Sequence, residues 1–98
     1  MSYRLRLQPE ARDDIREARL WYDEQRAGLG REFVEEVETV LGAIRTNPAR
    51  FTVVYRHFRR ALLHRFPYGI VFAVTDETVQ VVPCLHARRD PGTWRDRV

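Results

Sequence analysis

Residues 9–48, PEARDDIREARLWYDEQRAGLGREFVEEVETVLGAIRTNP, decide the fold of this chain. Pro9 suits the first position of a helix, because the backbone N–H that it lacks would have no partner there. Apolar residues then recur at helical spacing, which predicts a helix with one buried stripe that ends near Arg26. That stripe consists of Ala11, Ile15, Ala18 and Tyr22, with Trp21 beside it.

A second amphipathic helix is predicted over about residues 31–46, after a tight turn at Gly28-Leu29-Gly30. Asn47-Pro48 ends this helix, because proline cannot continue it. Its inner stripe consists of Phe33, Val37, Val40, Leu41 and Ile44, and its outer face carries Glu32, Glu35, Glu36 and Glu38. Two amphipathic helices joined by so short a turn are expected to form an antiparallel hairpin.

The residues on either side of this hairpin alternate with a period of two, which indicates strands. One short strand is expected at residues 3–7, where apolar residues alternate with arginine. Strand candidates after the hairpin are residues 52–55, 60–66, 70–74 and 78–85, with turns at 67–69 and 75–77. Pro83 lacks a backbone donor, so the last strand requires a bulge or an edge position there.

The order strand, helix, helix, strands predicts an α+β fold, a two-layer sandwich in which the helix hairpin covers one face of the sheet. Strands joined by short turns pair with their neighbours, so the sheet is expected to be mainly antiparallel. Its other face is left for solvent or a partner. Asp90-Pro91 begins a short C-terminal helix or tail. A length of 98 residues suits one domain, and we expect residues 1–98 to form it.

The charge is unevenly distributed along the chain. All seventeen basic residues are arginine. Residues 1–49 carry eight arginines and ten carboxylates, whereas residues 50–98 carry nine arginines and four carboxylates. Arginine binds carboxylates and phosphates through two parallel hydrogen bonds, so the basic second half indicates an acidic or polyanionic partner.

Several classes of protein are not indicated by the sequence. No apolar run approaches the roughly twenty residues that a membrane span requires, and the N-terminus lacks the apolar core of a secretory signal. We therefore expect a cytoplasmic protein without membrane contact. Cys84 has no second cysteine to pair with and is expected to be a small buried apolar residue. The spacing of the three histidines fits no metal motif, and neither a metal nor a cofactor is expected.

A set of short motifs, in this order and spacing, resembles the RelE/ParE superfamily of bacterial toxins from type II toxin–antitoxin pairs. The motifs are Ala18–Tyr22 (ARLWY), Gly28-Leu29-Gly30 with Phe33, Asn47-Pro48, Arg59-Arg60, Phe66-Pro67-Tyr68, His86, Arg89-Asp90-Pro91 and Trp94. The likeness covers nearly the whole chain and implies the same fold as the periodicity does. It also implies a cognate antitoxin whose acidic C-terminal segment wraps the toxin in a hetero-oligomer.

The resemblance implies two activities between which the fold does not choose. RelE-like members cleave mRNA on the ribosome, whereas ParE-like members inhibit DNA gyrase. RelE-like nucleases carry several lysines and a tyrosine near the C-terminus, and this chain has no lysine and no tyrosine after Tyr68. We therefore favour the ParE-like branch. A ribosome-dependent mRNA endoribonuclease is the alternative, and an inactive remnant that only binds antitoxin is the third interpretation.

The candidate site residues differ between these interpretations. If the protein is an enzyme, it is a metal-independent endoribonuclease, which needs an acid, a base and cations at the scissile phosphate. In that case His86 acts as acid or base, with Arg60 and Arg65 stabilising the charge. Contacts to the antitoxin or target are assigned to Arg59, Arg60, Arg65, Arg88, Arg89 and Trp94.

Each of these residues also has a purely structural interpretation. His86 can hydrogen-bond the turn at Arg89-Asp90, and Trp94 can cover an edge of the sheet. Trp21 and Tyr22 are expected in the helix core. Strand alternation through residues 60–66 predicts two pairs on opposite faces of the sheet, Arg59 with Arg65 and Arg60 with His64.

Overall fold

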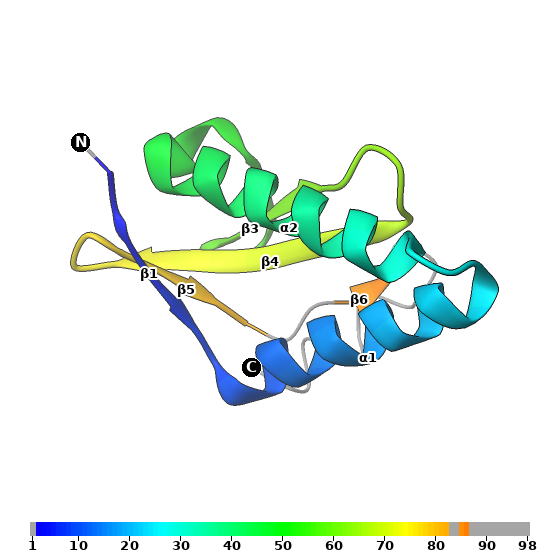
Figure 1. Cartoon of the computed structure of the whole chain (residues 1–98). Coiled ribbons are helices and arrows are strands. Elements are labelled where there is room, and N and C mark those ends of the chain that lie inside the picture. The colour runs from blue at the N-terminus through cyan, green and yellow to red at the C-terminus, as the bar shows by residue number, and fades with distance from the viewer. Residues whose placement is uncertain (1, 83–84, 87–98) are drawn as a thin grey trace.

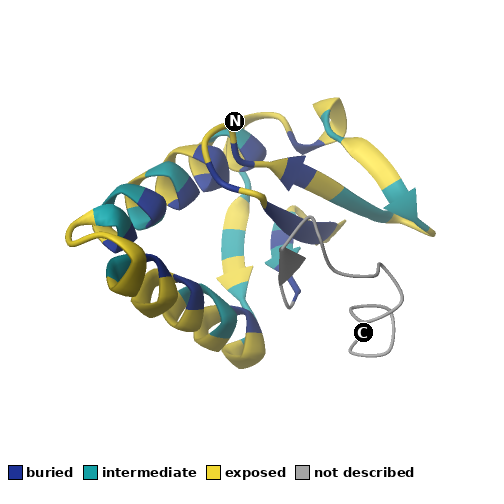
Figure 2. Ribbon diagram, turned by 90° about the vertical axis from the view of Figure 1, so that its right-hand side faces the viewer, coloured by how far each residue is buried: buried dark blue, intermediate teal, exposed yellow. Residues whose placement is uncertain are grey.

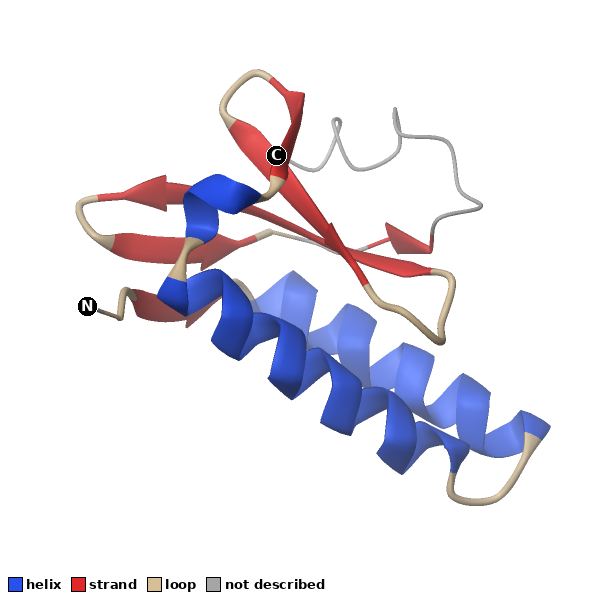
Figure 3. Ribbon diagram, turned by 90° about the horizontal axis from the view of Figure 1, so that it is seen from above, coloured by secondary structure: helices blue, strands red, loops and turns tan. Residues whose placement is uncertain are grey.

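The computed structural model describes residues 2–82 and 85–86. Two helices and a mixed sheet follow one another in the order that the periodicity predicts (Figure 1). The elements are β1 (Arg4–Leu7), α1 (Pro9–Gln25), α2 (Leu29–Thr46), the 3-10 helix η1 (Pro48–Arg50), β2 (Thr52–Tyr55), β3 (Phe58–Leu62), β4 (Tyr68–Thr75), β5 (Thr78–Val81) and β6 (Leu85–His86). Seen from above, the two long helices lie on one side of the molecule and the strands on the other (Figure 3). The predicted α+β two-layer sandwich is confirmed.

The sheet has the strand order β1-β5-β4-β3-β2, and β6 pairs with β4. Neighbouring strands from β2 to β5 pair antiparallel, as expected for short turns, whereas β1 lies parallel to β5. The last predicted strand, residues 78–85, is divided in two. β5 pairs with β4 at residues 72–75, and β6 pairs with it at residues 68–69. The bulge or edge position predicted for Pro83 lies outside the described residues.

The connection between the helices is shorter than predicted, because α2 begins at Leu29 instead of residue 31. Gly28 precedes the helix with a φ of 87°, a conformation that favours glycine. Gly30 lies against α1, and its N–H donates to Asp23 Oδ1 at 2.8 Å. A Cβ on Gly30 would lie 2.4 Å from the backbone oxygen of Arg19, so the second glycine permits the close approach of the helices. Within the described chain, neither helix has the length and apolarity to cross a membrane.

The core lies between the helix hairpin and the sheet, with its buried residues turned toward the interior (Figure 2). Every residue of the predicted inner stripe of α2 is buried, and its members are Phe33, Val37, Val40, Leu41 and Ile44. In α1 the buried residues are Ala11, Ala18 and Tyr22, with Ile15 partly buried against the same cluster. The expectation that Trp21 belongs to the core is wrong: it is 49% exposed. Successive residues of a helix are rotated by about 100°, so Trp21 lies beside the buried stripe of Tyr22 and not within it.

Four aromatic rings connect the two layers of the core. The ring centroids of Tyr22 in α1 and Phe33 in α2 lie 5.1 Å apart. Phe66 lies 4.8 Å from Tyr22, and Tyr68 of β4 meets Phe33 at 4.9 Å, both edge-on. Such contacts add about 0.5–1.5 kcal/mol to the stabilisation that burial provides. The cluster therefore fixes the end of the sheet at which β4 begins.

The strand predicted at residues 60–66 is displaced, because β3 spans Phe58–Leu62. Tyr68 and Gly69, predicted in a turn, are the first residues of β4. The N–H of Leu63 donates to Tyr68 O at 3.0 Å, so the chain reverses within residues 64–67. The alternation therefore does not reach His64 or Arg65, and the predicted pairing of faces for these two residues is wrong.

The sheet face away from the helices carries a small apolar cluster of its own. Val71 and Val82 are buried there, and Val54, Tyr55 and Phe58 pack against them partly buried. The backbone N–H of Val82 donates to Val71 O at 3.0 Å. This face, expected to be open, is therefore partly apolar and partly lined by exposed residues of β3.

Candidate functional site

Arg60 marks the candidate site on the sheet face away from the helices. It pairs with Val71 across β3 and β4, while the adjacent Ala61 is 1% exposed and faces the helix layer. Successive strand residues point to opposite faces, so Arg60 and the 51% exposed Leu62 project away from the helices. Among the described residues no carboxylate pairs with Arg60. Its guanidinium is therefore available to an anionic partner.

Arg59 is the neighbour of Arg60 but has a different role. Its side chain is half-buried, and its Nη1 donates to the backbone oxygens of Ala49 at 3.1 Å and Phe51 at 2.6 Å. These oxygens belong to η1 and the residue that precedes β2. Arg59 thus links β3 to the connection between α2 and β2, and these hydrogen bonds favour a structural role.

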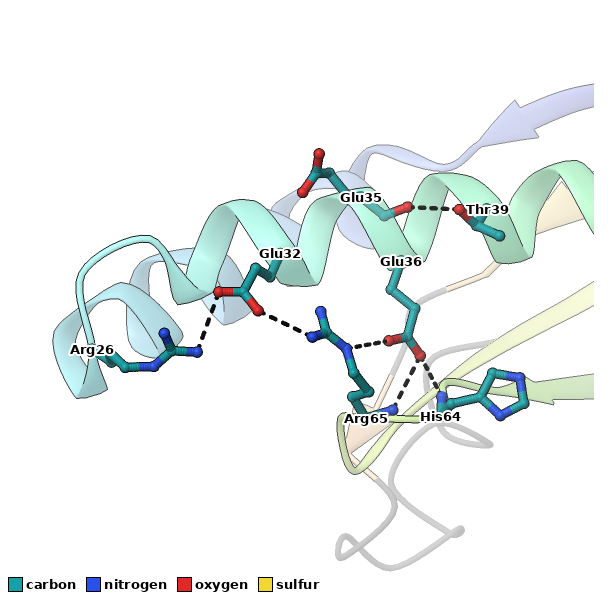
Figure 4. Close-up of polar contacts among 7 residues, drawn as sticks. All are labelled: Arg26, Glu32, Glu35, Glu36, Thr39, His64 and Arg65. Carbon is teal, nitrogen blue, oxygen red and sulfur yellow. Dashed lines mark hydrogen bonds and ion pairs between the residues drawn. The ribbon is translucent and has the colours of Figure 1, made fainter.

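Arg65 is held by two carboxylates of α2 (Figure 4). Its Nε lies 3.4 Å from Glu36 Oε1, and its Nη1 lies 3.1 Å from Glu32 Oε1. Glu32 also pairs with Arg26 at 3.2 Å, which extends the network to the end of α1. The positive charge of Arg65 is therefore offset within the chain before any partner binds.

Glu36 also binds the backbone of the loop after β3, a contact that the sequence did not predict. Its Oε2 accepts the backbone N–H groups of His64 and Arg65, the latter at 3.3 Å, while its other oxygen faces the Arg65 side chain. The Glu36 side chain is 12% exposed. Glu32 and Glu36 are four residues apart and share one helix face. That face, expected to be turned to solvent, instead meets the loop between β3 and β4.

The turn between β2 and β3 presents two further basic side chains. Arg56 adopts a φ of 51°, and its guanidinium carbon lies 5.2 Å from the centroid of the Tyr55 ring. His57 stacks on Phe58 with 4.5 Å between ring centroids. Arg56 and His57 are exposed, so both side chains lie at the surface beside aromatic rings. Such an arrangement suits the binding of carboxylates or phosphates.

Of the predicted site residues near the C-terminus, only His86 is among the described residues. In β6, His86 pairs with Tyr68 and Leu85 pairs with Gly69. The backbone of His86 thus lies beside the beginning of β4, whereas Arg60 pairs with Val71, three residues further along that strand. Arg88, Arg89 and Trp94 lie outside the described residues, and their assignment stays a prediction.

The electrostatic character of the site follows from a stretch without acids. Residues 39–75 contain six arginines and no aspartate or glutamate. Of these arginines, only Arg65 forms a salt bridge with a carboxylate in the described structure. Arg60 on β3 and Arg56 in the turn before it are therefore exposed cations beside the outer apolar cluster, whereas the Arg50 guanidinium carbon lies 5.0 Å from the ring centroid of Phe51, which packs against the core between the layers. No group of three metal-ligating side chains occurs within residues 2–82 and 85–86.

Comparison with known proteins identifies the family. Residues 5–91 match the model of the family described as the ParE toxin of the type II toxin–antitoxin system parDE. The chain therefore belongs to the ParE toxin family, and it is a ParE-like toxin of the type II toxin–antitoxin class. It is 28% identical over 93 residues to Toxin ParE2 of Mycobacterium tuberculosis, in both strain CDC 1551 / Oshkosh and strain H37Rv. That alignment covers 94% of this chain and 89% of the relative.

Solved structures share the fold. A chain of the chromosomal ParDE toxin–antitoxin system from P. aeruginosa superposes with a TM-score of 0.77 at 13% identity, covering 87% of this chain and 96% of that one. A chain of the RelBE2 toxin–antitoxin complex from Mycobacterium tuberculosis gives a TM-score of 0.61 at 21% identity, covering 88% and 99%. At these identities the likeness supports the fold, and the choice of target depends on the site.

Proposed function

We propose that this toxin binds a cognate antitoxin through its basic sheet face and, when released, inhibits DNA gyrase. The observation that supports the antitoxin contact most directly is Arg60, an exposed cation on a central strand with no carboxylate partner among the described residues. An acidic segment laid across this face would pair with Arg60 and cover the exposed Leu62 beside it. Two structural relatives come from toxin–antitoxin systems, which fits this proposal.

The ion pairs of Arg65 weigh against RNA cleavage, the alternative activity. A metal-independent nuclease uses cations that are free to stabilise the pentacoordinate phosphate. One of the two arginines assigned to that task, Arg65, already forms ion pairs with Glu32 and Glu36. The match to the ParE family model points the same way.

The alternative is a ribosome-dependent mRNA endoribonuclease, and one observation favours it. The stem of Arg60 lies close to Gly69, and the backbone of His86 pairs with the adjacent Tyr68. Histidine and arginine are residue types that suit acid–base and electrostatic catalysis. A third possibility, an inactive remnant, requires only antitoxin binding.

One experiment distinguishes the three interpretations. The purified toxin is added to a gyrase supercoiling assay and to a translation reaction in which mRNA ends are mapped by primer extension. Gyrase inhibition with intact mRNA supports the proposal, and cuts at codon positions with normal supercoiling would refute it. Induction of the toxin alone that leaves growth unchanged would support the remnant.

The antitoxin contact is tested by co-expression. A short open reading frame that abuts the toxin gene and encodes an acid-tailed protein is co-expressed with the tagged toxin. A stable complex whose formation abolishes growth arrest supports the pairing. Toxicity that is unchanged in the presence of that protein would contradict it.

A further inference from the structure

Gly69 is the second residue of β4, and the backbone conformation at this position does not require a glycine. Among the described glycines a positive φ occurs at Gly28, whereas Gly69 adopts a conformation that other residues also adopt. Gly69 lies within the sheet, paired with Leu62 on one side and Leu85 on the other. Glycine is unfavourable inside a strand, so another feature must explain its presence there.

The space where a Gly69 side chain would project is occupied by Arg60 and Leu62. A Cβ built on Gly69 would lie 3.1 Å from Cδ and 3.2 Å from Cγ of Arg60, and 3.2 Å from Cδ2 of Leu62. Ordinary carbon contacts are about 3.5–4.0 Å. Leu62 is the direct cross-strand partner of Gly69, whereas Arg60 is the diagonal neighbour that pairs with Val71. The stem of Arg60 therefore leans along the sheet and lies over the bare backbone of Gly69.

This geometry directs the guanidinium toward one end of the sheet. Arg60 leans from Val71 toward Gly69, and Gly69 is also the residue of β4 at which β6 joins. A stem that rests on a flat backbone has fewer rotamers to lose than one that extends into solvent. An arginine held in this way binds a carboxylate at a lower entropic cost.

We propose that Gly69 is a positioning residue: its missing side chain seats Arg60 across β4, where its guanidinium receives a carboxylate from an acidic peptide segment. The inference rests on the proposed antitoxin binding, and it adds to that function a residue that makes no polar side-chain contact itself. It predicts that Gly69 matters to recognition only through Arg60. A side chain at position 69 lifts the Arg60 stem off the sheet and removes the guanidinium from its binding position.

A double-mutant cycle tests this dependence. The four proteins are the unsubstituted toxin, Arg60→Ala, Gly69→Val and the double variant, each titrated with the protein encoded beside the toxin gene. Valine favours strands more than glycine does, so weaker binding would not come from a weakened strand. Thr75→Val, which places the same side chain at the exposed far end of β4, is the matched control.

The expected result is non-additive. Loss of a hydrogen bond to a charged group corresponds to a Kd increase of about tenfold to a hundredfold, which we expect for Arg60→Ala. Gly69→Val should reproduce most of that increase, yet change the Kd less than about twofold in the Arg60→Ala background, because residues that act through one another are not additive. Thr75→Val should bind like the unsubstituted toxin. Equal effects of Gly69→Val with and without Arg60, or no effect of either single substitution, would overturn the proposal.

A measurement on the free toxin separates this inference from the proposed function. If the unsubstituted toxin forms no complex, the antitoxin proposal fails, and the role of Gly69 is then judged by NMR alone. A nuclear Overhauser effect between Gly69 Hα and Arg60 Hδ is expected, and Gly69→Val should move the Arg60 Hε resonance while leaving that of Arg59 in place. Absence of that Overhauser effect would overturn the seating of Arg60.

Discussion

Glu36 and Arg65, 29 residues apart in the chain, hold each other through both backbone and side chain: the Arg65 N–H donates to Glu36 Oε2 at 3.3 Å, and Arg65 Nε to Oε1 at 3.4 Å. The same carboxylate accepts the N–H of His64. This contact attaches the loop between β3 and β4 to the middle of α2. Because that loop leads directly into Tyr68 and Gly69, the contact also helps to position the beginning of β4.

Replacement of Glu36 should destabilise the fold. Glu36→Ala leaves the backbone N–H groups of His64 and Arg65 without their acceptor, which costs about 1–3 kcal/mol in the free energy of unfolding. Urea denaturation followed by circular dichroism measures this loss. Glu35→Ala is the matched control, because Glu35 is an exposed neighbour whose backbone oxygen, not its carboxylate, accepts from Thr39 (Figure 4). Equal midpoints for the two variants would contradict the assigned role of Glu36.

The two helical glycines should respond to alanine in opposite directions. Gly30→Ala places a methyl group against the Arg19 carbonyl and should destabilise the protein by about 1–3 kcal/mol, as overpacking does. Gly42 is also in α2 but is exposed, with no atom within 4 Å of a built Cβ. Gly42→Ala should stabilise by up to about 1 kcal/mol through helix propensity. Thermal melts give both signs, and a Gly30→Ala variant as stable as the parent would refute the close contact of α1 with α2.

The two adjacent arginines of β3 should differ in their effect on stability, because Arg59 has a structural role and Arg60 is expected to bind a partner. Arg59→Ala removes the donor to Ala49 and Phe51 and should lower the free energy of unfolding by about 1–2 kcal/mol. Arg60→Ala should leave stability within about 0.5 kcal/mol, as expected for an exposed side chain. Denaturation curves for both variants test this, and a larger loss for Arg60→Ala would contradict the assignment.

Antitoxin association should be slowed by salt, and Arg60 should contribute to that dependence. Exposed charges steer encounter, and ions at 0.15 M screen them beyond about 8 Å. Stopped-flow association rates for the unsubstituted toxin should fall as salt rises, with a shallower slope for Arg60→Ala. Arg31→Ala, on the exposed part of α2, serves as a charge-matched control. A rate that does not change with salt would argue against a charged contact surface.

Phe33 of the core and Trp21 at the surface should differ sharply in their contributions to stability. Phe33→Ala empties a site that is fully buried among three rings and should cost about 3–5 kcal/mol. Trp21→Ala should cost much less, because nearly half of that side chain faces solvent. Guanidinium denaturation measures both values. A Trp21→Ala loss as large as that of Phe33→Ala would restore Trp21 to the core.

The sequence determined the elements whose signal is local. All five apolar residues of the α2 stripe are buried, because a 3.6-residue period fixes which side of a helix faces the core. The strand candidates at 52–55 and 70–74 were likewise predictable, because alternation acts over a few positions. The turn expected at 75–77 occurs at 76–77, since Thr75 is the last residue of β4. The α+β class follows from the order of these elements. Arg60 was named as a candidate together with Arg59 and Arg65 through the family resemblance, and the sequence did not distinguish the three.

The tertiary structure decided every feature that depends on residues far apart in the chain. Whether Arg65 is free or neutralised depends on Glu32 and Glu36, and helix periodicity alone assigned those acids to solvent. The parallel pairing of β1 with β5 joins the two ends of the described chain. The sequence predicted Gly69 in a turn, whereas the structure places it in β4 with the Arg60 stem lying over it. Charge and periodicity are properties of a segment, whereas the partner of a side chain is set by packing. Packing alone decided that Arg60 is exposed while Arg59 and Arg65 are engaged within the chain.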